Sequence, residues 1–500
     1  MNVDQPRLDT QHLTARVRVP VIVACAEPIR AGRIVVAAQR DQRGTVQPFA
    51  VVGKRHVGGG TVIHVGQSTA LNGQMPLSDH RFRTEQCMPD RAPRAVNGEH
   101  SMQNIHVAIV GAGLGGLALA QALKQAGIAF DVYERDAALD SRRQGYRIRI
   151  DATGQRALAA CLPAGLAALF RASASQGTSG LRLATPRLTP AAGHAPAGWH
   201  TAPDTADLSV NRLTLREILM AGIEDRVHFG HAVDRYRLLP DGRAHVTFAS
   251  GTSGSVMCDV LVGADGVHST IRAQLVAAAA PVRTGALCVY GRTRLPTDDP
   301  AFAEAAGLRA ATTVIVADGC AAVLEDMRFR GDLRALAAHV APRSRFTRPD
   351  DYFYWAVIGP SNRFGLDGAD TTAALAARLP AALRHVVQDW HPVLRRLLLD
   401  TPPGAVTALP VRRGRPDVAL PAGPVTLLGD AIHAMSPAGG VGANTALRDA
   451  GALAAWLAGQ TANGGNIRHA LTRYAEDMRG WATDAVIASD RAATLLFAGG

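Results

Sequence analysis

The chain has 500 residues, of which 47% are hydrophobic and 19% are charged. This length exceeds what one compact core usually holds, so we expect two or more domains, and the composition is typical of a globular protein rather than a disordered one. The formal net charge is +11, but the basic residues are scattered arginines without a dense basic run or interleaved aromatics, which argues against nucleic-acid binding.

The first hundred residues differ from the rest of the chain. Residues 1–101 contain neither Tyr nor Trp, and short apolar pieces alternate with polar and Gly-rich stretches. The N-terminus, MNVDQPRLDT, lacks the basic start and apolar block of a secretory signal. We expect residues 1–101 to be a loosely structured extension, or sequence upstream of a natural start at Met102. A small additional domain is the alternative.

From Ile105 onward, strand and helix signals alternate. Residues 105–110 predict a buried strand, residues 114–126 an Ala- and Leu-rich helix and residues 130–133 the next strand, which together form a β-α-β unit. The later predicted elements are a helix at 213–220, strands at 244–248 and 260–263, a second sheet containing 286–292, 314–316 and 352–358, and a last buried strand at 425–428. A long Ala-rich helical region follows to the C-terminus.

The cysteines and the apolar stretches exclude two further kinds of protein. Six cysteines lie far apart with no Cys-x-x-Cys pair, so neither a zinc site nor a disulfide framework is expected. No apolar stretch reaches the roughly 18 residues that cross a bilayer. These features predict a cytoplasmic protein without metal or membrane contacts, and they leave open a monomer or a homodimer.

The first motif is a G-x-G-x-x-G made of Gly111, Gly113 and Gly116. The first glycine permits a tight turn, the second lets the backbone approach a pyrophosphate and the third lets the helix pack on the strand; the helix, beginning at Leu114, offers free N–H groups to phosphates. Glu134 ends the next strand eighteen residues later, where a carboxylate can accept from ribose hydroxyls. The unit predicts dinucleotide binding, either FAD or NAD; a Gly-rich turn with a surface glutamate is the alternative.

A second motif, DVLVGADGVHSTIR, occupies residues 259–272. A strand runs into a turn at Asp265 and Gly266, and the helix that follows carries Ser269 and Arg272. An Asx turn with an N-cap explains these residues as well as a cofactor site does. By itself the motif therefore does not choose between a structural and a binding role.

The third motif, LGDAIHAMSPAGGVGANTALRDA, occupies residues 428–450. A strand delivers Asp430 at its end, where the carboxylate can accept from a ribityl hydroxyl. The glycines after Pro437 let the backbone run flat against a ring, and a helix beginning near Asn444 would stabilise negative charge on a reduced flavin. His433 is expected to be a packed or backbone-bonded histidine rather than a base. A plain loop leaves so many closely spaced glycines unexplained, so the motif predicts a flavin site.

At these three motifs the chain resembles the single-component FAD-dependent aromatic hydroxylases, which share the para-hydroxybenzoate hydroxylase fold. The second and third motifs look like that family's DG and GD signatures, and VNRLTLR at 210–216 is similar to the segment whose arginine reaches the flavin, with Arg212 at the matching position. Residues 133–136 and 145–151 look closest to the tetracycline-inactivating and polyketide hydroxylases. Ser436 and Val441 stand where many relatives have Pro and Gln. The resemblance covers residues 104–480.

The resemblance implies an α/β fold with a Rossmann-like FAD-binding domain, an inserted mixed-sheet substrate domain and C-terminal helices. The FAD-binding domain is then expected at residues 102–172, 207–278 and 412–460. The substrate domain is expected at 173–206 and 279–411, and the C-terminal helices at 461–500.

The motifs and the resemblance together predict which residues bind FAD. They are Gly111, Gly113, Leu114, Gly116, Glu134, Arg135, Arg147, Arg212, Asp265, Gly429, Asp430, Pro437, Gly440, Gly442, Ala443 and Asn444. The resemblance implies that NAD(P)H reduces the flavin, that O2 adds at C4a, and that the hydroperoxide passes an oxygen to an aromatic or polyketide-like small molecule. No side-chain nucleophile is then needed. Another flavin oxidoreductase, such as a dehydrogenase or halogenase, and a non-catalytic flavin-binding sensor remain the alternatives.

Overall fold

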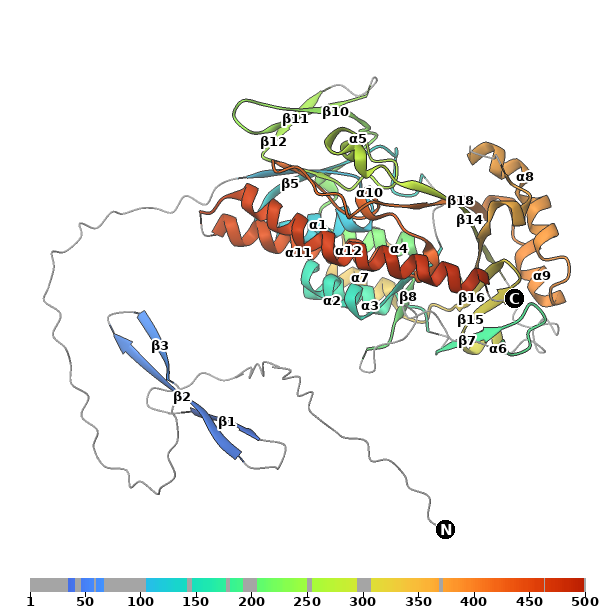
Figure 1. The fold of residues 1–500 in the computed structure, drawn as a ribbon, viewed down its shortest axis with the longest axis horizontal. Helices are drawn as coiled ribbons and strands as arrows, with labels where there is room; N and C mark the ends of the chain where they lie inside the picture. The colour runs from blue at the N-terminus through green and yellow to red at the C-terminus, as the bar shows by residue number, and fades with distance from the viewer. Residues whose placement is uncertain are drawn as a thin grey trace, which may run out of the picture. The chain divides into compact units, whose positions relative to one another are not determined.

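The computed structural model of the protein describes residues 35–40, 46–57, 60–66, 105–141, 146–176, 180–191, 205–249, 254–294, 307–367, 372–462 and 464–498. The chain divides into two compact units, residues 1–96 and 97–500. In the first unit β1 (Val35–Arg40), β2 (Val46–Val57) and β3 (Gly60–Gly66) form an antiparallel meander (Figure 1). Most of residues 1–101 lie outside the described residues, so the loosely structured extension stays a prediction.

The second unit is built on a five-stranded parallel sheet with the strand order β19-β13-β4-β5-β9. The strands are β4 (His106–Val110), β5 (Ala129–Glu134), β9 (Val227–Phe229), β13 (Val260–Gly263) and β19 (Val425–Leu427). The central strands are almost continuously apolar because a parallel sheet is buried on both faces. Helix α1 (Leu114–Gln125) joins β4 to β5, which confirms the predicted β-α-β unit.

Helices and a small sheet cover the parallel sheet. On one side α1 packs with α4 (Arg212–Met220), α2 (Ala152–Cys161) and the long α11 (Gly442–Ala462), which in turn packs on α12 (Ile467–Ala498) (Figure 1). On the other side lie α5 (Thr270–Leu275) and an antiparallel sheet of β10 (Val233–Leu238), β11 (Ala244–Phe248) and β12 (Ser255–Cys258). None of the described helices has the length and apolar character that a membrane crossing requires.

A six-stranded sheet, called here the substrate sheet, lies in the part of the chain for which a substrate domain is predicted, and its strand order is β18-β14-β17-β16-β15-β7. All neighbours are antiparallel except β15 and β7. The strands are β7 (Leu181–Ala184), β14 (Val282–Thr293), β15 (Thr312–Ala317), β16 (Cys320–Met327), β17 (Tyr352–Pro360) and β18 (Val406–Arg413). The mixed sheet and the parallel sheet confirm the fold class expected from the sequence.

The two faces of the mixed sheet have different neighbours because side chains alternate along each strand. Along β17, Phe353 and Trp355 pack with α8 (Thr372–Val386) and α9 (Pro392–Leu399) in one buried cluster. Tyr352 and Ile358 point the other way, into a cluster that also contains Ala438 of the third motif. One face of the substrate sheet is therefore covered by helices, and the other lies against the glycine loop of the parallel-sheet domain.

Candidate functional site

The glycine loop between β4 and α1 leaves one open position at the helix start. A Cβ atom at Gly111, where φ is +110°, would lie 2.3 Å from the carbonyl oxygen of Ala264, and one at Gly116 would lie 2.1 Å from the carbonyl oxygen of Gly111. A Cβ at Gly113, the N-cap residue of α1, would meet nothing within 4 Å. The protein itself thus requires two of the glycines, and the third faces open space in which a pyrophosphate fits.

Two charged side chains hold the backbone N–H and carbonyl of Ala112, the residue between Gly111 and Gly113. Glu134 accepts from the N–H of Ala112 at 2.8 Å and, with its other oxygen, from the N–H of Asp136 at 3.0 Å. Arg216 donates from Nε and Nη2 to the carbonyl of Ala112 at 3.1 and 2.9 Å, and from Nη1 to Leu139. Both side chains are buried. Each carboxylate oxygen of Glu134 still has a lone pair with which to accept from a ribose hydroxyl.

Arg216 was not among the predicted site residues, although a sequence signal for it exists. It lies four residues after Arg212 in the VNRLTLR segment, so both arginines are on the same side of α4. Arg212 is the first residue of α4 and is half-buried, while Asn211 caps the helix through the N–H groups of Leu213 and Thr214. In the structure Arg216 reaches the glycine loop between β4 and α1, and the predicted contact of Arg212 with FAD stays a prediction.

The arginines at 147 and 149 have different surroundings. Arg147 points to the substrate sheet, where Nη2 lies 2.5 Å from Oε2 of Glu325 and the guanidinium carbon 5.9 Å from the ring centroid of Tyr354. Arg149 is buried and lies beside the glycine loop of the third motif, because its guanidinium carbon is 3.8 Å from where a Cβ of Gly440 would be. The predicted contact of Arg147 with FAD remains a prediction, and Arg149 is an additional candidate.

Asp265 of the second motif has both a structural and a ligand-directed oxygen. Its Oδ2 accepts from the N–H groups of Thr270 and Ile271 at 2.7 and 3.3 Å, and Ser269 caps α5 by accepting from the N–H of Arg272. Its Oδ1 is buried and has no hydrogen-bond partner within the described part of the chain. Burial raises the pKa of this carboxyl. The Cα of Asp265 would lie 3.1 Å from a Cβ at Gly111, so this residue is next to the first glycine motif, and an unpartnered oxygen on it suits a hydroxyl group of a bound dinucleotide.

The position of Asp430 differs from the sequence expectation. Strand β19 ends at Leu427, and Asp430 is instead the first residue of the short helix α10 (Asp430–His433). The chain leaves the sheet at Gly429, whose φ of +63° and ψ of −148° suit glycine, and whose N–H donates to Asp449 on α11 rather than to a neighbouring strand. The Asp430 side chain is exposed, so its carboxylate remains available to a ribityl hydroxyl.

The rest of the third motif forms a tight turn and a helix start. The 3-10 turn η7 (Pro437–Gly439) is followed by Gly440 with φ of +65°. Helix α11 then begins at Gly442, two residues before the predicted start near Asn444, and Ala443 lies in its first turn. Asn444 therefore lies inside the helix, and its side chain holds β6 (Ile148–Ile150) by donating to the carbonyl of Arg149 and accepting from the N–H of Asp151. Pro437 is exposed and Leu114 is buried.

Tyrosines line the face of the substrate sheet that meets this loop. Tyr290 and Tyr352 belong to the same cluster as Ala438, and Tyr146 joins them from the segment before β6. The guanidinium carbon of Arg292 lies 4.9 Å from the ring centroid of Tyr146 and 5.7 Å from that of Tyr352. Burial raises the pKa of Tyr352, so its phenol keeps its proton at neutral pH.

A group of cationic side chains lies beside the second motif. His268 is exposed at the start of the turn into α5, and Arg135 is exposed directly after Glu134. Partial burial, followed by the positive charges of Arg412, Arg135 and Arg272, lowers the pKa of His268. Arg412 lies on β18, Arg135 directly follows β5 and Arg272 lies on α5. Together they concentrate positive charge around His268.

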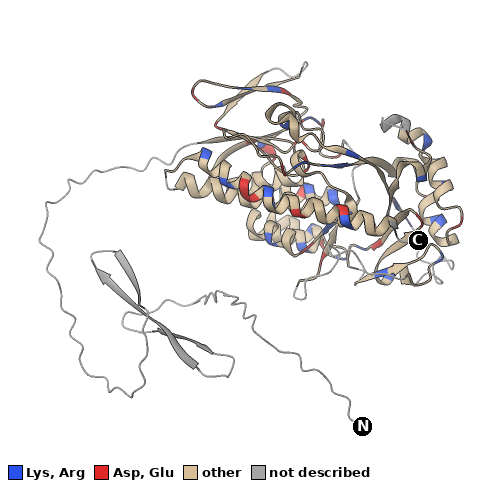
Figure 2. Cartoon of the chain, viewed as in Figure 1, with Lys and Arg blue, Asp and Glu red and all other residues tan. Residues whose placement is uncertain are grey.

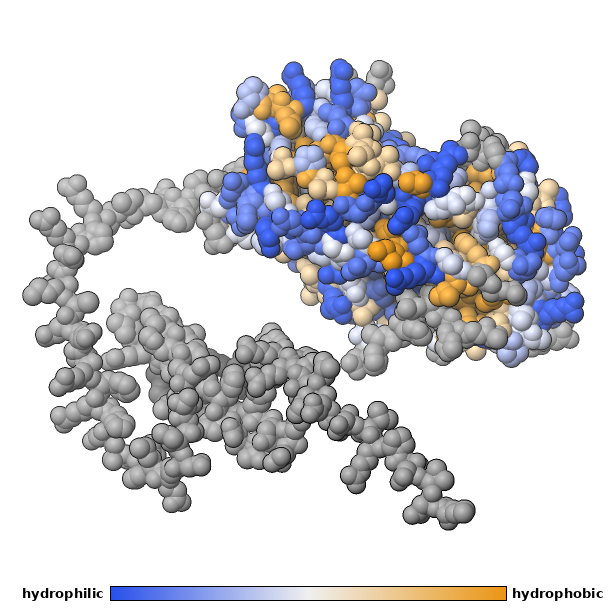
Figure 3. Space-filling view, viewed as in Figure 1, coloured by the Kyte–Doolittle hydropathy of each residue, from blue (hydrophilic) through white to orange (hydrophobic). Residues whose placement is uncertain are grey.

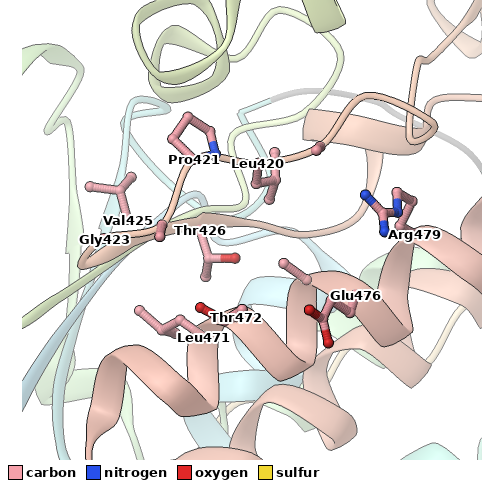
Figure 4. A pocket seen from close by; sticks show the side chains of 12 residues that line it. Leu420, Pro421, Gly423, Val425, Thr426, Leu471, Thr472, Glu476 and Arg479 are labelled. Carbon is pink, nitrogen blue, oxygen red and sulfur yellow. The ribbon is translucent and has the colours of Figure 1, made fainter.

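The hollow drawn in Figure 4 lies apart from the three motifs. It has a volume of about 170 Å³ and is bounded by residues 419–423, by Val425 and Thr426 of β19 and by the first turns of α12. None of its lining residues belongs to the motifs, and the volume is below the roughly 300–1,000 Å³ of ordinary ligand sites. The candidate site therefore does not coincide with this hollow.

Sequence comparisons agree with the motifs. The sequence model of a family described as an FAD binding domain matches residues 104–297 and 377–489. The dual O-methyltransferase/FAD-dependent monooxygenase CTB3 of Cercospora beticola is 36% identical over 429 residues, covering 79% of this chain and 45% of the relative. The FAD-dependent monooxygenase thnD of Trichoderma harzianum is 30% identical over 356 residues, covering 70% of this chain and 82% of the relative. The chain thus spans less than half the length of CTB3 but most of the length of thnD.

Two solved structures share the fold of this chain. A protein from Photorhabdus luminescens subsp. laumondii, described as an FAD-containing monooxygenase, has a TM-score of 0.64 at 29% identity, covering 79% of this chain and 99% of that chain. HpxO of Klebsiella pneumoniae, solved with FAD and uric acid, has a TM-score of 0.61 at 21% identity, covering 80% and 90%. At the lower identity the likeness concerns the fold alone.

Proposed function

The chain belongs to the family of FAD-dependent monooxygenases that share this FAD-binding domain, and on that premise we propose that it uses NAD(P)H and O2 to hydroxylate a small aromatic or polyketide-like molecule. The proposal is supported chiefly by one observation: Ala438 of the glycine loop packs in the same buried cluster as Tyr146, Tyr290 and Tyr352 of the substrate side. A flavin held by the loop would face an aromatic-lined sheet.

The three motifs would divide the cofactor between them. Gly113 and the start of α1 suit the pyrophosphate, Glu134 the ribose, and Asp265 and Asp430 the hydroxyls of the ribityl chain. Bound FAD supplies the redox chemistry, in which two electrons come from NAD(P)H, one oxygen atom of O2 enters the substrate and the other leaves as water. The protein has to bind the flavin, exclude water and aim the substrate.

The substrate side favours a flat, electron-rich ring. Tyrosine rings pack edge-to-face or offset against other aromatic rings, and a guanidinium adds attraction to a π face or to a phenolate. Arg292 lies over the rings of two tyrosines. Val314 and Val323 belong to the same buried cluster as these tyrosines and add apolar surface beside them. This composition supports the aromatic or polyketide-like class over a small polar metabolite.

The cationic group around His268 supports a nicotinamide nucleotide as the electron donor. A pyrophosphate carries negative charge, and Arg135, Arg272 and Arg412 concentrate positive charge beside the second motif. Elsewhere the Lys and Arg positions are scattered along the described elements in the view of Figure 2. A cofactor that docks and leaves would use this local charge.

The experiment that tests the function measures three quantities together on the FAD-loaded full chain. Candidate phenols and polyketide-type quinones are added while NADPH or NADH oxidation and O2 uptake are followed, and the product is analysed by mass spectrometry after reaction in ¹⁸O2. We expect substrate-stimulated oxidation and one labelled oxygen in the product. Turnover without O2 uptake would indicate a dehydrogenase, halide-dependent turnover a halogenase, and FAD binding without turnover on any substrate a flavin-binding sensor.

A further inference from the structure

We propose that Asp449 is a positioning residue for FAD: from α11 it holds the turn that presents Asp430. The inference rests on the proposed FAD site in the third motif and assigns a role to a residue that would not itself touch the cofactor. Asp449 is fully buried. Its Oδ2 accepts from the N–H of Gly429 at 2.9 Å and pairs with Nε2 of His433 at 2.6 Å, and its Oδ1 accepts from Nε1 of Trp481 at 2.8 Å.

Both ends of the short segment that carries Asp430 are tied to this carboxylate. Before Asp430, the N–H of Gly429 is held directly. After it, His433 is held through its ring, while the carbonyl of Gly429 accepts from the N–H groups of Ile432 and His433 at 3.0 Å each. The orientation of the peptide group at Gly429 sets the direction in which the Asp430 side chain points. Asp449 therefore fixes an exposed side chain by clamping the backbone on both sides of it.

Hydrogen-bond donors around Asp449 stabilise its buried carboxylate. A buried carboxylate without partners would be costly, but three donors surround Asp449. Burial alone would lower the pKa of His433, yet the charge of Asp449 and the hydrogen bond to it outweigh burial and raise that pKa. Because a carboxylate only accepts, Nε2 of His433 is the donor in its hydrogen bond to Asp449. Trp481 of α12 donates only to Oδ1 of Asp449, whereas Gly429 and His433 contact Oδ2. The two carboxylate oxygens can therefore be tested separately.

Asp449→Asn tests the clamp because an amide cannot accept from all three donors. If its oxygen serves Gly429 and His433, its NH2 faces the N–H of Trp481, and if it is flipped, its NH2 faces Gly429. We expect FAD to bind about 10–150-fold more weakly in a titration of apo-protein. The double variant Asp449→Asn/Trp481→Phe lacks the indole N–H that would face the amide NH2. Its amide oxygen can therefore stay at Gly429, and a large part of the FAD affinity should return. Trp481→Phe alone should keep FAD affinity within about threefold.

A matched control separates positioning from general loss of stability. Leu457 lies on the same helix about two turns beyond Asp449 and is fully buried, so Leu457→Ala should lower the melting temperature while FAD affinity stays within about twofold. If Asp449→Asn binds FAD as tightly as wild type, or if Leu457→Ala loses FAD to the same extent at an equal loss of melting temperature, the proposal is overturned.

A second pair keeps the test decisive where Asp449→Asn is recovered only as aggregate. His433→Gln retains an N–H that can reach Oδ2 and should retain FAD, whereas His433→Leu cannot donate and should weaken FAD binding about tenfold or more. Equal FAD affinity of the two variants contradicts the clamp. Because the readout is FAD affinity, a wild-type protein that binds FAD without hydroxylating anything contradicts the proposed function and leaves the Asp449 result standing.

Discussion

Glycines of the first motif differ in what an added methyl group would meet. At Gly116 a Cβ would lie 2.1 Å from a backbone oxygen, which cannot move aside without breaking the turn. At Gly113 the same atom would enter open space at the start of α1, and the backbone there has a φ of −74° that any residue adopts. One glycine thus serves the fold and the other leaves room for a ligand.

Gly113→Ala and Gly116→Ala should therefore fail in opposite ways. We expect Gly113→Ala to keep the wild-type melting temperature and to bind FAD at least about tenfold more weakly, because its methyl group occupies the pyrophosphate position. Gly116→Ala should lower the free energy of unfolding by about 1–3 kcal/mol through overpacking. Thermal melts of apo-protein beside FAD titrations measure both effects, and a stable Gly116→Ala protein would show that the helix can shift.

Asp430 is exposed at the start of α10, so its contribution should be to the ligand rather than to the fold. Asp430→Ala removes a charge-assisted hydrogen bond of about 1.5–3 kcal/mol, equivalent to a roughly 10–150-fold loss of FAD affinity. The melting temperature of apo-protein should not change. Asp234→Ala, an exposed aspartate on β10, is the matched control. Wild-type FAD affinity in Asp430→Ala would mean that this carboxylate only ends a turn.

At the scale of elements, three neighbouring strands of the parallel sheet carry a cluster of ionisable side chains outside the candidate site. Asp131 of β5 lies 2.8 Å from Nε2 of both His106 on β4 and His228 on β9, so one carboxylate joins three neighbouring strands. The hydrogen bond to Asp131 raises the pKa of His106. Burial acts to raise the pKa of Asp131, but the bonds to the two histidines outweigh it and lower that pKa.

The stability that this cluster contributes should depend on pH. A histidine whose pKa is raised in the folded state contributes its full stabilisation below about pH 6.5, and this stabilisation is lost as the pH rises through the folded pKa. An aspartate whose pKa is lowered in the folded state contributes its stabilisation above about pH 4. We expect the melting temperatures of wild type and Asp131→Asn to differ most, by up to about 3 °C, between these limits and to converge near pH 9. A difference that grows toward pH 9 would contradict the assignment.

Three elements supply the cationic group beside the second motif, so its role can be separated from that of the FAD site. Arg412→Ala on β18 should raise the KM for the nicotinamide nucleotide about 5–50-fold, because one charge facing the pyrophosphate is lost. FAD content and kcat should be kept. Arg415→Ala, whose arginine is paired with Asp417 on the surface, is the control. An unchanged KM in Arg412→Ala would remove the docking site from this place.

At the scale of the whole second unit, α12 joins the two sheets. Its first turns pack on the parallel-sheet domain through Leu471 and Tyr474, and Tyr474 donates to the carbonyl of Leu427 at 3.0 Å. Its last turns reach the substrate sheet through Ala492 and Leu496. The visible face of this unit is mainly hydrophilic with small apolar areas (Figure 3). One helix therefore fixes the spacing between the parallel sheet and the tyrosine-lined face of the substrate sheet.

Residues 1–96 and 97–500 are separate compact units, which makes the truncation testable. A chain that begins at Met102 retains every element of the parallel and mixed sheets. We expect it to bind one FAD per chain and to melt at the temperature of the full chain, because no motif lies before Gly111. Aggregation of the truncated chain, with a full chain that stays in solution, would show that the extension is part of the fold.

The sequence by itself determined the β-α-β unit, the second sheet and the positions of the three motifs. Buried strands, a helix with its glycine turn and clustered glycines are local patterns, and a few neighbouring residues specify them. Asp430 begins a short helix instead of ending the strand, because the N–H of Gly429 bonds to Asp449 of α11, twenty residues further along the chain. Tertiary packing alone decided such long-range pairings.

The same reason explains which side chains the sequence did not find. Arg216 contacts Ala112 from 104 residues away, and Arg147 lies beside Glu325, which is 178 residues further along the chain. Asp449 was visible only as the end of a motif. Periodicity reports which face of an element is buried, but the partner of a buried charge depends on which elements pack there. That choice belongs to the tertiary structure.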